Sequence, residues 1–250
     1  MTLRICHDYE DLSRAAAELF ASEARRAVAA RGRFCVALSG GATPRRCYQL
    51  LAADPLREAV PWAQVEVFWG DERCVAEDDP RSNQRLAREA LLDRVPLPAG
   101  QIHPMVCTGD PEGAARDYQT LLEAAFFPAE PVLDLILLGL GADGHTASLL
   151  PGTEAPAETE RLVVPVRAAG ADFFRLSLTV PVLNRGRRIV FLVSGPEKAA
   201  ILQQILQGPP NRFPAQLIAP TDGQIVWLVD RAAAGEEDGH SSLFQQRSEP

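Results

Sequence analysis

The sequence predicts an α/β fold in which helices flank a doubly wound, mostly parallel, Rossmann-like sheet with a possible antiparallel edge. Short apolar runs alternate with segments of helical periodicity, and this alternation is typical of parallel sheets. Glycine-rich turns follow two of the runs, where a buried strand would pass into a helix or a loop. The 250 residues, 46% of them hydrophobic, are enough for one sizeable core.

The individual elements follow from hydrophobic spacing and from the residues that bound each segment. Helical spacing covers residues 11–30, and Gly32 separates it from the apolar strand 34–38. Strand 175–180 alternates apolar with hydroxyl side chains, which predicts a half-exposed or edge position. The same criteria predict further helices at 44–51, 82–92, 111–125 and 196–206, and further strands at 65–69, 135–138, 162–166, 188–194 and 225–229.

We expect one α/β domain over residues 1–233. Residues 234–250 are acidic, contain Gln and Ser, and have no hydrophobic period, so they are predicted to form a mobile polar tail. A formal net charge of -8 argues against nonspecific binding to nucleic acid. No segment approaches membrane-spanning length, and the N-terminal residues carry charges where a signal peptide needs an apolar core. We therefore expect a cytoplasmic protein without a membrane or obligate protein partner.

Cysteine and histidine spacing gives no sign of a cross-linked or metal-dependent protein. The cysteines are odd in number and contain no C-x-x-C pair, which predicts reduced, mostly structural thiols at Cys6, Cys35, Cys47, Cys74 and Cys107. The four histidines are scattered without ligand spacing, so no metal is expected.

The turn after strand 34–38 reads Ser39-Gly40-Gly41-Ala42-Thr43-Pro44 and opens a helix. Exposed amides at a helix N-terminus bind anions, and Thr43 adds a hydroxyl, so this turn is a candidate phosphate site. Pro44 is expected at the first helical position. An ordinary tight turn is the alternative, and the sequence lacks the G-K-[ST] ending of a Walker A loop.

The stretch DLILLGLGADGHTASLLPG, residues 134–152, ends a buried strand in a glycine turn that carries Asp143 and His145. A short helix is expected from His145 to the break at Pro151 and Gly152. The glycines also fit G-x-G-x-x-G, a dinucleotide fingerprint. Against that alternative, Asp143 would place a carboxylate where a pyrophosphate should lie, and strand 162–166 has no acidic residue at its end. Taken alone, a histidine after a tight turn is usually a solvated loop residue or a neighbour of a helix N-cap.

Charged residues mark three other predicted strand or helix ends. Asp71, Glu72 and Arg73 follow strand 65–69, either as part of a site or as a structural salt-bridge cluster. Arg175 begins a strand, and Lys198, the only lysine among 25 basic residues, lies between a strand and a helix. In a doubly wound sheet these ends can meet, and their positive charge would suit an anionic ligand.

Five segments carry a resemblance to a known family: LSGGATP from Leu38, FWGDER from Phe68, DDPRSN from Asp78, the stretch 134–152, and RLSLTVPVLNRGRRIVFLVSGPEKA ending at Ala199. In their order and spacing the chain resembles the 6-phosphogluconolactonases, within the superfamily that includes glucosamine-6-phosphate deaminase. The resemblance implies a cofactor-independent hydrolase of 6-phospho-D-glucono-1,5-lactone in the oxidative branch of the pentose phosphate pathway.

For such a reaction we expect each candidate residue to have a definite role. His145 would take a proton from the attacking water, and Asp143 would orient its ring. Arg73 would stabilise the carbonyl oxygen, with the Gly141 and Gly144 amides as further donors. Asp71 and Glu72 would position Arg73 or bind sugar hydroxyls. The phosphate is expected on the amides of Gly40 and Gly41 and on Thr43, Arg175 and Lys198.

Two competing functions can be weighed on particular positions. The deaminase pattern has a catalytic Glu shortly after the Asp-Gly-His and an acidic loop followed by Tyr, whereas this chain has Leu150 and Arg73 there. Both departures favour the lactonase. A sugar-phosphate sensor without turnover is the third possibility, and the joint presence of Asp143, His145 and Arg73 argues for catalysis instead. The sequence contains no G-x-S-x-G elbow, so it does not indicate a nucleophilic serine hydrolase.

Overall fold

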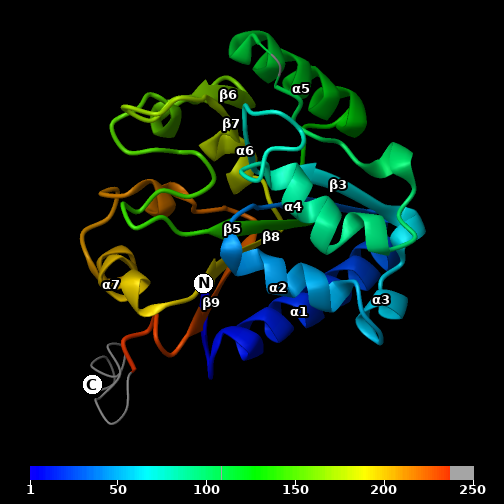
Figure 1. Ribbon diagram of the computed structural model, residues 1–250, viewed down its shortest axis with the longest axis horizontal. Helices are drawn as coiled ribbons and strands as arrows, with labels where there is room; N and C mark the ends of the chain where they lie inside the picture. Colours follow the sequence, from blue (N-terminus) through cyan, green and yellow to red (C-terminus); the bar gives the residue numbers. More distant parts are fainter. Residues whose placement is uncertain (108, 237–250) are drawn as a thin grey trace.

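A six-stranded, wholly parallel sheet forms the centre of the protein (Figure 1). The computed structural model describes residues 1–107 and 109–236. The strand order is β1-β9-β8-β5-β2-β3. The six strands are β1 (Thr2–Cys6), β2 (Phe34–Leu38), β3 (Val65–Trp69), β5 (Leu135–Gly139), β8 (Arg188–Val193) and β9 (Gln224–Asp230).

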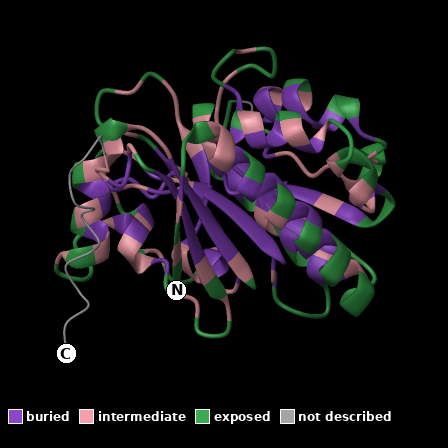
Figure 2. Ribbon diagram, turned by 90° about the horizontal axis from the view of Figure 1, so that it is seen from below, coloured by how far each residue is buried: buried purple, intermediate pink, exposed green. Residues whose placement is uncertain are grey.

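Helices cover this sheet, as the buried strands and the exposed outer faces in Figure 2 show. Every residue of β2 is buried, because a parallel strand with helices on both sides has no solvent face. The helices are α1 (Tyr9–Arg31), α2 (Ala42–Leu51), α3 (Leu56–Ala59), α4 (Asn83–Ala90), α5 (Pro111–Phe126), α6 (Val180–Asn184) and α7 (Ala199–Gln207). Short 3-10 turns occur at Trp62–Gln64, Leu92–Arg94, Ala99–Gln101, Ala155–Ala157, Pro196–Lys198 and Pro214–Leu217.

A second, three-stranded antiparallel sheet lies beside the first, with the order β4-β7-β6. It consists of β4 (Asp71–Arg73), β6 (Val163–Val166) and β7 (Arg175–Leu178), and α5 packs against β6 and β7. The edge position predicted for residues 175–180 is wrong, since β7 is the central strand. Its hydroxyl residue Ser177 is buried because its Oγ accepts the Ser148 N–H and donates to the Leu178 carbonyl.

The ends of the helices follow their capping residues. Helix α1 begins at Tyr9 because the Asp8 side chain accepts the Asp11 N–H, and it ends where Gly32 adopts a left-handed φ of 75°. Ser82 caps α4 by accepting the Arg85 N–H, so the helix begins at Asn83; it ends at Ala90, because Leu91 has a non-helical φ of -141°, and is therefore shorter than the predicted 82–92. Helix α2 starts at Ala42, which makes Pro44 its third residue and not its first.

Several expectations need correction. Two strands were not predicted: β1, a half-exposed edge strand, and β4, whose three charged residues follow soon after β3. No helix follows His145: residues 142–152 form successive turns, with an isolated bridge between Thr146 and Leu149. The predicted tail began too early, because Ala234 is buried and its N–H donates to the Asp230 carbonyl. Residues 237–250 of that tail lie outside the described residues.

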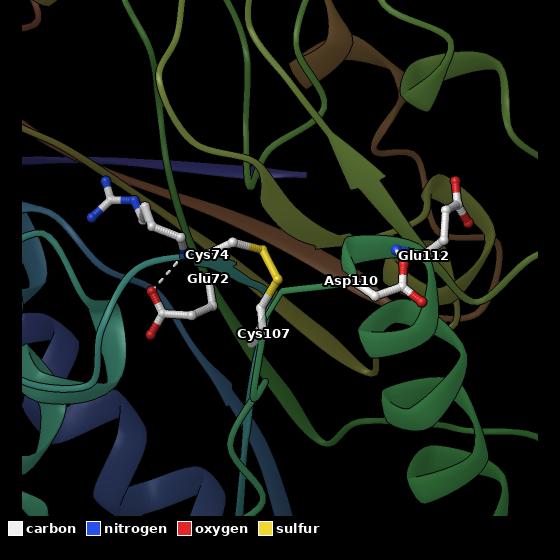
Figure 3. The surroundings of a disulfide bond; sticks show 6 residues. Glu72, Cys74, Cys107, Asp110 and Glu112 are labelled. Carbon is white, nitrogen blue, oxygen red and sulfur yellow. Dashed lines mark hydrogen bonds between the residues drawn. A yellow bond between two sulfur atoms is a disulfide. The ribbon is translucent and has the colours of Figure 1, made fainter.

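The prediction of five reduced cysteines is wrong for two of them. Cys74 and Cys107 form a disulfide, with Cα atoms 4.9 Å apart although the residues are 33 positions apart in sequence (Figure 3). The fold alone brings them together, so spacing along the chain held no sign of the pair. Cys6, Cys35 and Cys47 are free and buried, as expected. None of the described helices is both long and apolar enough to cross a membrane.

Candidate active site

A pocket of about 430 Å³ opens at the carboxyl ends of the parallel strands. Strand β2 has β3 on one side and β5 on the other. The order in which the chain adds strands therefore reverses at β2, and such a reversal leaves a crevice at the strand ends. The turns after β2, β5 and β8 form one side, and the small sheet forms the other. Of the predicted site residues, those that line the pocket are Gly40, Gly41, Thr43, Asp71, Arg73, Gly141, His145, Arg175 and Lys198.

The turn after β2 presents the start of α2 to the pocket. Gly41 has a φ of 91°, a conformation that glycine adopts without strain. It precedes the helix without a side-chain cap, so the first amides of α2 are left for a ligand or solvent. This geometry suits an anion.

Asn83, which was not predicted as a site residue, packs against this turn. A Cβ built on Gly40 would lie 1.6 Å from Asn83 Oδ1, so only glycine allows this approach. Asn83 is 1% exposed, lines the pocket and begins α4 after its Ser82 cap. Two sequence signals could have marked it: Asn83 ends the segment DDPRSN that carries the family resemblance, and it directly follows the serine at the predicted start of a helix.

His145 and Asp143 form a close pair in the turn after β5. Asp143 Oδ1 lies 2.5 Å from His145 Nδ1 and accepts the backbone N–H of the same histidine at 3.1 Å. Partial burial opposes the ionised form of Asp143, but the N–H and the ring of His145 outweigh it, so the pKa of Asp143 is lowered. Asp143 itself does not line the pocket, whereas the imidazole does, and His145 Nε2 has no partner among the described residues.

The glycines of this turn have a structural role. A Cβ on Gly141 would lie 2.2 Å from His145 Nδ1, so the imidazole can lie against this residue only because it has no side chain. The expectation that the Gly141 and Gly144 amides face a substrate oxygen is wrong. Gly141 N–H donates to the His145 carbonyl and Gly144 N–H to the Gly141 carbonyl, so both donors are used within the turn. Gly144 also lies outside the pocket lining, packed against Phe213.

Arg73 and Arg175 face the pocket from opposite positions on β4 and β7. Among the described residues neither arginine forms an ion pair with a carboxylate. Arg73 Nη1 donates to the Arg81 carbonyl at 2.6 Å, and Arg73 Nε is buried without a hydrogen-bond partner. The pKa of Arg175 is lowered by burial first and then by the positive charge of Arg73, whereas Asp71 and Asp143 act in the opposite direction. Two unpaired guanidinium groups side by side favour an anionic ligand between or above them.

Asp71 lies in the pocket with its carboxylate held from both sides. Ser148 Oγ donates to Oδ2 at 2.7 Å, and Asn83 Nδ2 donates to Oδ1 at 3.3 Å and to the Asp71 carbonyl at 2.8 Å. The residue is 6% exposed. Its orientation is therefore set before any ligand arrives, and the remaining lone pairs can accept from a hydroxyl.

Glu72 does not line the pocket and instead anchors α4. Its carboxylate accepts the backbone N–H groups of Arg73, Asn83 and Gln84 at 2.6–2.7 Å, and the Ser82 hydroxyl at 3.1 Å. Burial raises the pKa of Glu72 against the opposing effect of these donors. Of the two roles expected for this residue, the contacts support the positioning of Arg73.

Lys198 reaches the pocket from the 3-10 turn Pro196–Lys198 after β8. The buried carboxylate of Asp230 holds the start of this turn, because it accepts the Ser194 hydroxyl and the Gly195 N–H. Lys198 forms no ion pair with a described residue, so its charge is available to a ligand. No group of three or more potential metal ligands occurs within residues 1–107 and 109–236.

Comparison with known proteins agrees with this geometry. Residues 7–227 match the family described as glucosamine-6-phosphate isomerases/6-phosphogluconolactonase. A 6-phosphogluconolactonase of Synechocystis is 46% identical over 215 residues, which cover 83% of this chain and 86% of that protein. The structure of the 6-phosphogluconolactonase of Trypanosoma brucei superposes with a TM-score of 0.81 at 27% identity, covering 94% of this chain and 97% of that one.

A monomeric glucosamine-6-phosphate deaminase also superposes, with a TM-score of 0.80 at 23% identity over 95% of this chain and all of that one. At that identity the likeness extends to the fold alone. Lactonases and deaminases therefore share one scaffold, and the residues in the pocket have to distinguish the two reactions.

Proposed function

The chain belongs to the glucosamine-6-phosphate isomerase/6-phosphogluconolactonase family, and from this premise we propose that it is a 6-phosphogluconolactonase. It hydrolyses 6-phospho-D-glucono-1,5-lactone to 6-phospho-D-gluconate in the pentose phosphate pathway. The observation that carries this assignment is the Asp143–His145 pair at 2.5 Å, whose imidazole lines the same pocket as Arg73 and Arg175.

The phosphate binds at the end of the pocket formed by the first turn of α2. Gly40, Gly41, Thr43, Arg175 and Lys198 all line the pocket, and together they can supply amide or hydroxyl donors and positive charge to the phosphate. Fixing the phosphate orients the lactone, so binding energy remote from the ring lowers the barrier at the carbonyl.

His145 is the general base. Its Nδ1 faces the Asp143 carboxylate, so Nε2 takes a proton from water while the water oxygen attacks the lactone carbonyl carbon. Asp143 stabilises the imidazolium that forms. Arg73, whose Nε is buried and unpaired, stabilises the negative charge on the carbonyl oxygen. The intermediate then expels the ring oxygen, which recovers the proton from His145, and the new carboxylic acid releases a proton to solvent.

Asp71 accepts a sugar hydroxyl, since Ser148 and Asn83 fix its carboxylate at the pocket wall. Glu72 positions Arg73 through the backbone of β4 and the start of α4. The reaction adds water across an ester, so the scheme needs no cofactor or metal.

Wider assignments follow from the substrate. A charged sugar phosphate does not cross a bilayer unaided, so we place the enzyme in the cytoplasm. The domain expected over residues 1–233 extends to Ala234 and acts as one catalytic unit, because a single cluster of buried side chains runs from Cys6 to Ala234. The negative net charge argues against nucleic-acid partners.

The test is proton release on adding freshly generated 6-phosphogluconolactone to the purified protein, measured against spontaneous hydrolysis. Ammonia release from glucosamine 6-phosphate is measured in parallel. The proposal requires faster proton release and no ammonia. Ammonia would assign the deaminase reaction, and tight binding of 6-phosphogluconate without either reaction would assign a sensor.

A further inference from the structure

The Cys74–Cys107 disulfide joins the strand that carries Arg73 to the segment in front of α5 (Figure 3). Cys74 directly follows β4, and its N–H donates to the Phe174 carbonyl at 2.8 Å, which extends the pairing of β4 with β7. Cys107 precedes Asp110, the N-cap of α5, by three residues. The bond therefore holds the far end of β4, where the chain leaves the small sheet.

The two sulfur atoms belong to residues that solvent can reach in part. Cys74 and Cys107 are both intermediate in exposure, and Val106, beside Cys107, is 61% exposed. The other three cysteines contrast with this pair. Cys6, Cys35 and Cys47 are at most 2% exposed, and burial raises the thiol pKa of all three, to about 12 for Cys35 and Cys47. Thiol chemistry in the folded protein is thus confined to residues 74 and 107.

The position of the bond matters because of the two arginines. Arg73 and Arg175 are direct cross-strand neighbours of like charge without a described carboxylate partner, and such pairs repel one another. Apart from the pairing of β4 with β7, Arg73 is held by three hydrogen bonds: Nη1 donates to the Arg81 carbonyl, its N–H donates to the Glu72 carboxylate, and its carbonyl accepts the Val75 N–H. Reduction of the disulfide removes a covalent constraint one residue from Arg73. Fewer contacts then oppose the repulsion between Arg73 and Arg175.

We propose that Cys74–Cys107 is a reversible thiol–disulfide exchange site whose substrate class is small or protein dithiols, and that its oxidation state sets how well Arg73 is positioned. A disulfide in a reducing compartment is usually redox-active and not structural. The coupling to activity rests on the catalytic role proposed for Arg73. The oxidised enzyme is the more active form.

The exchange is balanced in thiols and electrons. A thiolate of the dithiol attacks one sulfur of the pair, forms a mixed disulfide and releases the other cysteine as a thiolate, which is then protonated. The second thiol of the reductant displaces the remaining protein sulfur. Two electrons and two protons pass to the protein, and the dithiol becomes a disulfide.

The first experiment counts reactive thiols in the whole, folded chain. Oxidised protein should show no thiol that reacts quickly with a thiol-specific reagent. After equilibration with dithiothreitol under native conditions, two should react, and removal of the reductant in air or with oxidised glutathione should hide them again. This count does not depend on lactonase activity, so it can succeed even where the proposed function fails.

The second experiment measures lactone hydrolysis by both forms. Reduction should lower kcat/KM by about fivefold or more, the lower end of typical couplings between sites. The pH profile should stay in place, because His145 and Asp143 lie on a different turn. Cys107→Ser does not change the sequence of β4. Its kcat/KM should equal that of the reduced wild type and should not change on addition of dithiothreitol. Val106→Thr is the matched control, with the disulfide and its response retained.

Three results would overturn the proposal. A pair that resists dithiothreitol in the folded protein would be a purely structural cross-link. A pair that stays reduced in oxidised glutathione would not be a redox site. Equal kcat/KM for the two forms, with the thiol count changing as expected, would remove the coupling to Arg73 while leaving the lactonase assignment intact. Thermal unfolding of Cys107→Ser shows whether lost activity is lost folding.

Discussion

The two sheets contribute to the pocket in different ways. The large parallel sheet provides turns, in which backbone shape does the positioning: Gly40 lies against Asn83, and Gly141 lies against the imidazole of His145. The small antiparallel sheet provides side chains, because strand register brings Arg73 opposite Arg175. On one side a missing Cβ makes the site possible, and on the other long charged side chains reach into it.

This difference shows how each side should respond to change. Turns after parallel strands define positions for a base and for anion-binding amides, so a small steric change there acts on the whole turn. Cross-strand arginines act through charge: neutralising Arg175 should weaken phosphate binding and neutralising Arg73 should slow the reaction, while the fold stays intact. The predictions below test this division.

The largest effect is expected at the turn after β5. His145→Ala should lower kcat by about 10²- to 10⁴-fold, the usual contribution of a general base. Proton release from the lactone measures it. His7→Ala, at a side chain 70% exposed, should keep full activity. A wild-type kcat in His145→Ala would show that His145 is not the general base. The turn after β5 would then lose the role that distinguishes it from the small sheet.

The next effect belongs to the small sheet. Arg175→Ala should raise KM by roughly ten- to a hundredfold, since a hydrogen bond to a charged group contributes about 1.5–3 kcal/mol. Arg175→Lys should recover part of the loss because the charge remains without the planar fork. Arg14→Ala, at an exposed side chain of α1, is the control. Steady-state kinetics at a series of lactone concentrations measures KM for each variant. An unchanged KM would mean that this side of the pocket does not hold the phosphate.

A smaller effect, on stability, separates a crowded glycine from an open one. Gly40→Ala should lower the free energy of unfolding by about 1–3 kcal/mol through overpacking against Asn83. Gly139→Ala, with nothing within 4 Å of the added Cβ, should change it by less than about 1 kcal/mol. Urea unfolding measures both. In an Asn83→Ala background the cost of Gly40→Ala should shrink, and equal costs in the two backgrounds would refute the contact.

The smallest effect depends on pH. The pKa of Asp143 is lowered in the folded protein, so the unfolded state binds more protons between the two pKa values. The resulting stabilisation is complete above the unfolded value of about 3.9 and is lost as pH falls through the folded one. Wild type should therefore exceed Asp143→Asn in stability near neutral pH, by less than about 1 kcal/mol for a half-exposed pair. The difference in stability between wild type and Asp143→Asn should disappear in acid. A difference that grows as the pH falls would contradict the lowered pKa of Asp143.

Much of the large sheet was predictable because its signals are local. The bounds of β2 and β3 were predicted to the exact residue. The glycine turns after β2 and β5 indicated the candidate phosphate site and the Asp143–His145 pair. The small sheet was harder. Strand β4 has three charged residues and no apolar pattern. Residues 175–180 were predicted to be half-exposed or at an edge because the buried hydroxyls of Ser177 and Thr179 resemble a solvated face.

What the sequence determined by itself was the set of chemical groups and the strand ends on which they lie, since periodicity and turn residues act over a few positions. Only the tertiary structure decided which groups meet. It paired Arg73 with Arg175 across 102 positions of sequence, pressed Asn83 against Gly40, used up the Gly141 and Gly144 amides within their own turn, and joined Cys74 to Cys107. Each of these depends on distances between distant segments, which are set by packing and strand register and leave no periodic trace along the chain.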